Sequence, residues 1–290
     1  MAKQLHRAVE RLLRVLLKRA IAAADDDDRP LCGRVHDLRT ALKKAKALLW
    51  LAEPLLGKRG RRQRKKLAAV ARRVGTVRDA AAVVETFDRL ARRGGRAASE
   101  LRKRLSARRR EAEQSPQTDR ELRRASEVLR SSRRRAKGLL GRGDERHALA
   151  IGFTNEYRRA RTAMNGARRR DTPEAFHDWR KTVKTHAYHV EVLTRAGMKE
   201  LRPRAAPLGA LGETLGAAHD LTLLEASLRA DGTTHSALLA KVQARRRSLD
   251  AEALALGRRL FDKPPSAMGR LVAGSPALAR LDREALVADG

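Results

Sequence analysis

The chain has 290 residues, which is long enough for one large or two ordinary domains with a hydrophobic core. Its 66 Lys and Arg residues outnumber its 34 Asp and Glu residues, so the formal net charge is +32 and any main partner must be anionic: nucleic acid, an anionic membrane surface or a phosphate polymer. Aromatic residues make up only 3 % of the chain and helix-forming residues abound, so the composition predicts an all-α protein without β-sheet.

Cysteine usage and apolar patterning indicate where the protein resides. Cys32 is the single cysteine, which excludes an intramolecular disulfide and fits a reducing compartment. The first 24 residues interleave apolar and basic side chains, without the continuous apolar core of a signal peptide. No stretch approaches about 18 uncharged apolar residues, so we expect no membrane span and a cytoplasmic location.

Helical periodicity and breaker residues predict six helices in the first half of the chain. Their expected ranges are 3–24, 30–53, 59–74, 75–94, 96–114 and 119–140. Pro30 suits the first turn of the second helix, and Gly75 separates the third helix from the fourth. The acidic run 25–28 is predicted to be a solvated turn, because adjacent carboxylates without clustered His or Glu make a poor metal cage.

The plan then repeats in the second half. The expected helices are 145–169, 173–194, 199–215, 218–229 and 233–260, followed by a weaker tail after Pro265. Thr172-Pro173-Glu174 is a typical helix start, with Thr as the N-cap, Pro at the first helical position and an acid in the first turn.

Two of these helices carry a stripe of cations beside an apolar arc. On a helix that turns by about 100° per residue, both stripes fall on one side, so each helix can bury one flank and present the other. The first stripe consists of His36, Arg39, Lys43 and Lys46. The second consists of His177, Arg180 and Lys184.

The two stripes belong to an internal repeat with a constant offset of 141 residues. The matching pairs are His36 and His177, Arg39 and Arg180, Lys43 and Lys184, Gly75 and Gly216, and Asp79 and Asp220. No gap is needed to align them. The repeat predicts two halves of similar size, 1–141 and 142–290, related by a pseudo-twofold axis, whose basic flanks could face one shared groove.

These residues resemble the CHAD domain, the conserved histidine α-helical domain. The first copy is similar to the family's pattern of His, Asp, any residue, Arg and further basic residues. The second resembles a later segment of the family, with Arg180-Lys181, Lys184, Tyr188 and Glu191. Each copy also has a follow-on element, Gly75-x-x-Arg78-Asp79 and Gly216-x-x-His219-Asp220. The resemblance spans nearly the whole chain.

The resemblance implies one domain over 1–290, with two four-helix-bundle halves and a basic central cavity that binds inorganic polyphosphate. The implied ligand-binding residues are His36, Arg39, Lys43, Lys46, Arg78, His177, Arg180, Lys181, Lys184 and His219. The implied supporting residues are Asp79, Asp220, Tyr188 and Glu191. The family often accompanies a CYTH triphosphatase domain with a Glu-x-Glu-x-Lys signature. Only Glu111-Ala112-Glu113 comes near it, without the lysine, so we expect no CYTH domain.

The chemistry of a phosphate chain suits these residue types. Such a chain offers only regularly spaced charge, so its receptor needs donors at comparable spacing; Arg supplies a bidentate fork and Lys a compact charge. His36 and His177 either contact phosphate or bridge helices beside the cavity. We expect Asp79 and Asp220 to orient the neighbouring Arg or His, and Tyr188 and Glu191 to form a hydrogen-bonding pair between helices.

Two other functions deserve comparison. The charge permits non-specific nucleic-acid binding, but there are few aromatic residues to stack on bases and no recognisable nucleic-acid-binding motif. Three His-Asp dipeptides resemble those of metal phosphohydrolases, yet neighbouring side chains on a helix diverge by about 100° and cannot readily share one metal. We therefore expect a binding protein that is not an enzyme, without metal or cofactor. Association with polyphosphate granules, and the oligomeric state, are left open.

Overall fold

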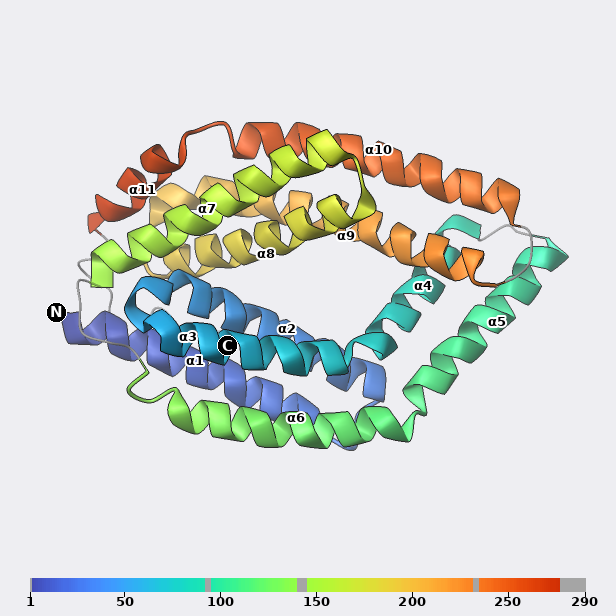
Figure 1. The fold of residues 1–290 in the computed structure, drawn as a ribbon, viewed down its shortest axis with the longest axis horizontal. Coiled ribbons are helices and arrows are strands. Elements are labelled where there is room, and N and C mark those ends of the chain that lie inside the picture. The colour runs from blue at the N-terminus through green and yellow to red at the C-terminus, as the bar shows by residue number, and fades with distance from the viewer. Residues whose placement is uncertain (1, 92–94, 140–144, 232–234, 277–290) are drawn as a thin grey trace.

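The structure, a computed structural model, describes residues 2–91, 95–139, 145–231 and 235–276 (Figure 1). Within these ranges it contains helices and no strands, which confirms the predicted all-α class. The helices are α1 (Ala2–Asp25), α2 (Leu31–Leu51), α3 (Glu53–Arg73), α4 (Gly75–Ala91), α5 (Arg96–Glu113), α6 (Pro116–Arg135), α7 (Glu145–Arg170), α8 (Pro173–Arg195), the short 3₁₀ helix η1 (Lys199–Leu201), α9 (Arg202–Arg229), α10 (Ser236–Leu260) and α11 (Pro265–Ala273).

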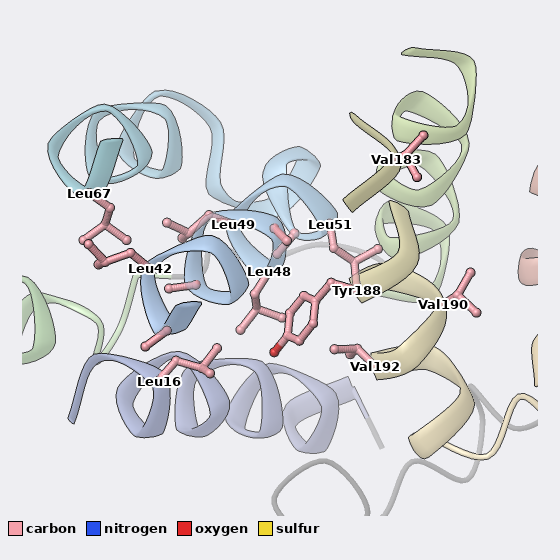
Figure 2. Close-up of a cluster of buried hydrophobic side chains, with 14 of the residues drawn as sticks. Leu16, Leu42, Leu48, Leu49, Leu51, Leu67, Val183, Tyr188, Val190 and Val192 are labelled. Carbon is pink, nitrogen blue, oxygen red and sulfur yellow. The ribbon is translucent and has the colours of Figure 1, made fainter. Parts of the chain in front are cut away.

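Helices α1, α2, α3 and α6 pack together as a first bundle. Their apolar stripes meet in its centre, where Figure 2 shows Leu16 of α1, Leu42 of α2 and Leu67 of α3 close together. All three leucines are at most 3 % exposed. Burying each contributes about 1.5–3 kcal/mol of transfer free energy, and a Leu42→Ala change would cost about 2–5 kcal/mol because a cavity also forms.

Helices α7 to α11 form a second bundle with a more aromatic centre. Phe153, Trp179 and Phe261 are at most 1 % exposed there. The predicted start of α8 is confirmed, because the Thr172 side chain accepts a hydrogen bond of 3.3 Å from the Ala175 amide. That cap fixes the beginning of the helix whose other face carries the second cationic stripe.

One continuous hydrophobic core joins the two bundles. Helix α2 packs against α8, and Figure 2 shows Leu48 and Leu51 of α2 beside Tyr188 of α8. Helix α2 also approaches α7 so closely that a Cβ atom at Gly152 would overlap the Leu51 carbonyl oxygen. A larger residue at Gly152 would therefore push the two bundles apart.

A second, smaller core closes the far end of the molecule. Helices α4 and α5 lead away from the first bundle towards the ends of α9 and α10 (Figure 1). Phe87 and Leu101 from this arm pack with Leu224, Leu228 and Val242. The two bundles thus meet twice, once where α2 contacts α8 and once where α4 contacts α9.

Two predicted helix boundaries are wrong. Helix α3 begins at Glu53 rather than at residue 59, and continues past Gly57, whose backbone takes the non-helical angles φ 49° and ψ −134°. Gly216 does not end a helix, because α9 is continuous from Arg202 to Arg229. A glycine inside a helix costs only about 1 kcal/mol relative to Ala, which the burial of neighbouring Leu215 and Ala218 offsets.

The other boundaries differ by a few residues. Helix α6 spans Pro116–Arg135 rather than 119–140, and α10 begins at Ser236. The part of the expected sixth helix at 140 and the expected start of α10 at 233–234 lie outside the described residues. In the acidic turn, Asp25 and Asp27 form ion pairs of 2.7 and 2.6 Å with Arg130 and Arg34.

Candidate functional site

Five cations from four helices gather where the two bundles meet. We call them the central cationic cluster: Arg39 and Lys43 of α2, Arg78 of α4, and Arg180 and Lys184 of α8. The pKa of Lys43 falls to about 8, because surrounding protein atoms displace water and because the other four cations lie near its ammonium group. Lys43 and Lys184 nevertheless keep exposed side chains, so an anion from solution can reach them.

The two arginines of the cluster each lie against a glycine. An Nη atom of Arg39 lies 3.1 Å from the place where a Cβ on Gly75 would stand, and Nε of Arg180 lies 3.7 Å from the same place on Gly216. Arg39 Nη1 also donates a hydrogen bond of 3.2 Å to the Ala71 carbonyl oxygen. Within the described chain, both Nε atoms are buried without a hydrogen-bond partner. Each guanidinium therefore retains unused donor capacity.

Two carboxylates offset part of this charge. Asp220 is partly buried, which raises its pKa, while Arg78, Arg180, Arg89 and Lys184 act to lower it. Its nearest ion-pair partner is Arg89, at 4.0 Å. Asp79 is exposed and contributes negative charge near Arg180 and His177. With five cations against these two acids, the cluster keeps an excess of positive charge.

His177 and His219 form a pair at one edge of the cluster, with ring centroids 4.2 Å apart. Burial, helped by Lys181 and Arg180, lowers the pKa of His177. Burial followed by the charges of His177, Arg180, Lys181 and Arg78 lowers the pKa of His219 to about 3. Both rings are therefore neutral near pH 7, and each then offers one N–H donor.

His36 has different surroundings from its counterpart His177. Its side chain is exposed on α2, and in the described part of the chain it makes no hydrogen bond, ion pair or ring contact. The neighbouring Asp37 instead pairs with Arg29 at 2.8 Å. The structure thus brings His177, but not His36, into contact with another site residue.

Lys46 and Lys181 extend the cluster. The pKa of Lys46 is lowered by burial and then by Arg39, Arg72 and Lys181. Lys181 is exposed and pairs with Asp178 at 2.7 Å. Arg72 and Arg89 also belong to this region, although sequence reasoning did not select them. The position of Arg72 three residues before Gly75 was the one available signal.

Tyr188 and Glu191 lie farther along α8 and do not form the expected hydrogen-bonding pair. Three residues apart on one helix, they face the same way and both meet Lys44 of α2. The Lys44 ammonium is 5.6 Å from the Tyr188 ring centroid and 3.7 Å from the Glu191 carboxylate. Glu191 also pairs with Arg195 at 3.1 Å. These two residues therefore join the bundles without touching the central cluster.

The remaining histidines of α8 belong to the core. His186 is fully buried among Phe153, Tyr157 and Phe261, and His189 Nε2 lies 2.7 Å from the Ala47 carbonyl oxygen of α2. Among the described residues, no three His, Cys, Asp or Glu side chains are grouped as a metal site requires.

The described helices include none that is long and apolar enough to cross a membrane.

Comparisons with known proteins agree with this architecture. The CHAD domain crystal structure from the plant Ricinus communis superposes with a TM-score of 0.54 at 18 % identity, covering 96 % of this chain and 93 % of the other. The structure of PptA from Streptomyces chartreusis gives a TM-score of 0.62 at 17 % identity, covering 89 % and 99 %. No curated protein sequence matches significantly. The family model for the CHAD domain matches residues 7–229, a range that includes every residue of the central cationic cluster. The chain belongs to the CHAD domain family.

Proposed function

We propose that this protein binds inorganic polyphosphate at the central cationic cluster. The observation that carries the proposal is the convergence of Arg39, Lys43, Arg78, Arg180 and Lys184 from both halves of the chain, close enough to lower the pKa of Lys43 to about 8. Membership of the CHAD family, known for polyphosphate binding, supports the same ligand.

Mutual repulsion in the cluster favours a polyanion. Five like charges held together by the packing of α2, α4, α8 and α9 destabilise the free protein, and an anionic chain placed among them removes that penalty. Phosphate oxygens accept charge-assisted hydrogen bonds, and the unused Nε donors of Arg39 and Arg180 are available for them. Lys46, Lys181 and Arg72 offer a path along which the chain continues.

The histidine pair adds a protonation step. His177 and His219 are neutral in the free protein because burial and neighbouring cations lower the pKa of each. Phosphate charges nearby reverse the sign of the local field, so the pKa of each ring rises and the complex takes up protons. Protonated imidazoles have two N–H donors each in place of one.

The repeat supports a common ligand path through both halves. Residues 1–141 and 142–290 are, in our proposal, two related halves of one domain that surround a central cavity. The contact of Arg39 with Gly75 and that of Arg180 with Gly216 are equivalent contacts 141 residues apart. Beside His177 and His219 lies a small cavity of about 10 Å³, lined also by Arg246 and Asp250.

The protein acts as a binding protein in this proposal, with no catalytic step. The carboxylates of two His-Asp dipeptides, Asp37 and Asp178, pair with Arg29 and Lys181. Association with polyphosphate granules in the cytoplasm would follow from binding the polymer. Incubation with Mg²⁺ and polyphosphate should release no phosphate; release that is lost in the variants below would establish a hydrolase.

Competition between long-chain polyphosphate and duplex DNA tests the ligand. We expect polyphosphate to displace labelled DNA at about 150 mM salt, and the reverse competition to fail. The site is tested with K43E/K184E, which reverses two exposed lysines of the cluster, against K58E/K199E, which reverses two exposed lysines on α3 and η1. Both variants have the same net charge.

The cluster variant should lose about 10²-fold in affinity for polyphosphate, well beyond the loss in the control, because each lysine neutralises one phosphate and releases its counterion. Equal losses in the two variants would mean that only the overall charge attracts the polymer. Equal competition by DNA would favour a non-specific nucleic-acid-binding protein. Circular dichroism checks that both variants remain helical.

A further inference from the structure

A second basic pocket lies on the outside of the first bundle, between α1 and α6, which run side by side (Figure 1). Its volume is about 300 Å³, at the lower end of the range of pockets that bind small molecules. We call it the outer basic pocket. Its lining residues are Arg14, Lys18 and Ile21 of α1, and Arg130, Arg133 and Arg134 of α6.

Helical spacing explains why these side chains converge. Arg14, Lys18 and Ile21 lie four and then three residues apart, so they share one face of α1. The opposite face carries Leu13 and Leu17, at most 2 % exposed, which hold α1 in the core of the bundle. On α6, the three arginines fall at positions i, i+3 and i+4 and meet the α1 face edge to edge.

The pocket has far more positive than negative charge. Arg130 pairs with Asp25 at 2.7 Å. Within the described ranges, the other four cations, Arg14, Lys18, Arg133 and Arg134, form no ion pair or hydrogen bond. Nε of Arg133 is buried without a hydrogen-bond partner. Four unpaired cations and an unsatisfied buried donor around one concavity are the features of an anion site lacking its anion.

The outer basic pocket is distinct from the central cationic cluster. Its residues come from α1 and α6, whereas the cluster residues come from α2, α4 and α8. Buried Leu38 and Leu42 of α2, on the flank adjoining its cationic stripe, belong to the core that joins α1 to α2. A single short ligand therefore does not occupy both places through one set of contacts.

We propose that the outer basic pocket is a second polyphosphate-binding site, so that one protein molecule holds two segments of phosphate chain. This inference rests on the proposed function for the choice of ligand. Two sites on one molecule raise the avidity for a long chain that can reach both, because the second contact becomes intramolecular. When the two segments belong to different chains, the protein cross-links them.

Calorimetric titration with inorganic tripolyphosphate counts the sites. Four variants of the full chain are compared with the wild type: the outer variant R14Q/K18Q/R133Q/R134Q, the central variant K43Q/K184Q, their combination, and the control R245Q/R247Q/R258Q/R259Q. The control removes four exposed arginines of α10, which in the described residues form no ion pair. Thermal unfolding confirms that each variant folds.

We expect two tripolyphosphate ions per wild-type molecule, one per outer variant and one per central variant. The lost site should weaken at least about tenfold, and the control should keep both. Light scattering with long-chain polyphosphate supplies a second readout: the wild type should form large cross-linked particles, while the outer variant should bind the chain without cross-linking it.

The possible failures separate the two proposals. One ion per wild-type molecule, with no loss in the outer variant, overturns the second site and leaves the central site intact. Loss in the outer variant alone, with none in the central variant, overturns the central site and leaves the outer one. An equal loss in the α10 control reduces the pocket to diffuse charge and overturns it. So does an outer variant that loses binding to duplex DNA or to anionic phospholipid vesicles but keeps two tripolyphosphate ions.

Discussion

Helices α2 and α8 carry the same cationic pattern, yet each pattern has different neighbours. On α2, Arg39 donates to the carbonyl oxygen of Ala71, and His36 faces solvent. On α8, Arg180 lies near Asp220, and His177 stacks on His219. The chain thus uses one pattern to build two unequal environments.

The difference follows from one position of the repeat. Arg78 stands in the first copy where His219 stands in the second. Arg78 adds a permanent charge to the cluster near Lys43 and Arg180, whereas His219 supplies a ring that is neutral at pH 7. One side of the site therefore has fixed charge and the other has charge that depends on protonation, which teaches that matching residues need not have matching roles.

The largest expected effect tests whether both helices bind. Arg180→Gln and Arg39→Gln should each weaken polyphosphate binding at least tenfold, because each guanidinium provides a bidentate contact to phosphate. Each change should also lower the slope of log K against log salt by about 1. The control is Arg168→Gln, an exposed arginine of α7. A normal affinity in either cluster variant would leave a single binding helix.

A smaller effect should appear in the stability of the free protein. Lys43→Gln removes one charge from a repulsive group, so we expect thermal unfolding about 2 °C higher, the scale of about 1 kcal/mol or less in a chain of this size. Lys184→Gln should gain less, because Asp220 and Glu213 attract the Lys184 ammonium and oppose the lowering of its pKa. A loss of stability in Lys43→Gln, measured by calorimetry without ligand, would show that the cluster is not under repulsion.

The pH dependence of binding should be weaker still and should distinguish the histidines. The pKa of His219 is about 3 in the free protein and rises when phosphate arrives, so between the two values binding takes up protons and affinity falls as pH rises. Above pH 8, Lys43 adds to this fall, since its pKa in the free protein is about 8. Stability changes in the opposite sense there: deprotonation relieves repulsion in the folded state, so the free protein gains stability as pH rises above 8.

Calorimetry near pH 6.5 in two buffers of different ionisation enthalpy measures the proton uptake. His219→Gln and His177→Gln should reduce it. His36→Gln should leave it unchanged, because that ring is exposed and has no contact with the pair. Equal reduction in all three variants would remove the distinction between α2 and α8.

Sequence reasoning could predict what local chemistry fixes. The cationic stripes, the Thr172 cap and nearly all helices follow from spacing and from residue type, and the structure confirms these helices and this cap. It could not predict that Gly216 would continue a helix, because the same residue type separates α3 from α4 at Gly75. That outcome depends on packing around the glycine rather than on the glycine itself.

The unpredicted parts of the site depend on contacts between distant segments. Arg72 and Arg89 lie among many other arginines, and only the folded chain selects them by bringing them near Lys46 and Asp220. The outer basic pocket likewise joins residues more than 100 positions apart along the chain. A single sequence contains no record of which basic residues will meet across helices.

The smallest expected effect concerns the end of α8 outside the cluster. Tyr188→Phe should leave polyphosphate affinity within about twofold and stability within about 0.5 kcal/mol, because in the described residues the hydroxyl forms no hydrogen bond and the Phe ring keeps the Lys44 contact. Glu191→Gln should cost about 0.5 kcal/mol by weakening its partly exposed pairs with Lys44 and Arg195. Denaturant unfolding and the binding titration measure both. A loss of affinity in Tyr188→Phe as large as that in Arg180→Gln would extend the ligand path along the whole of α8, and the part that joins the bundles would then also bind the polymer.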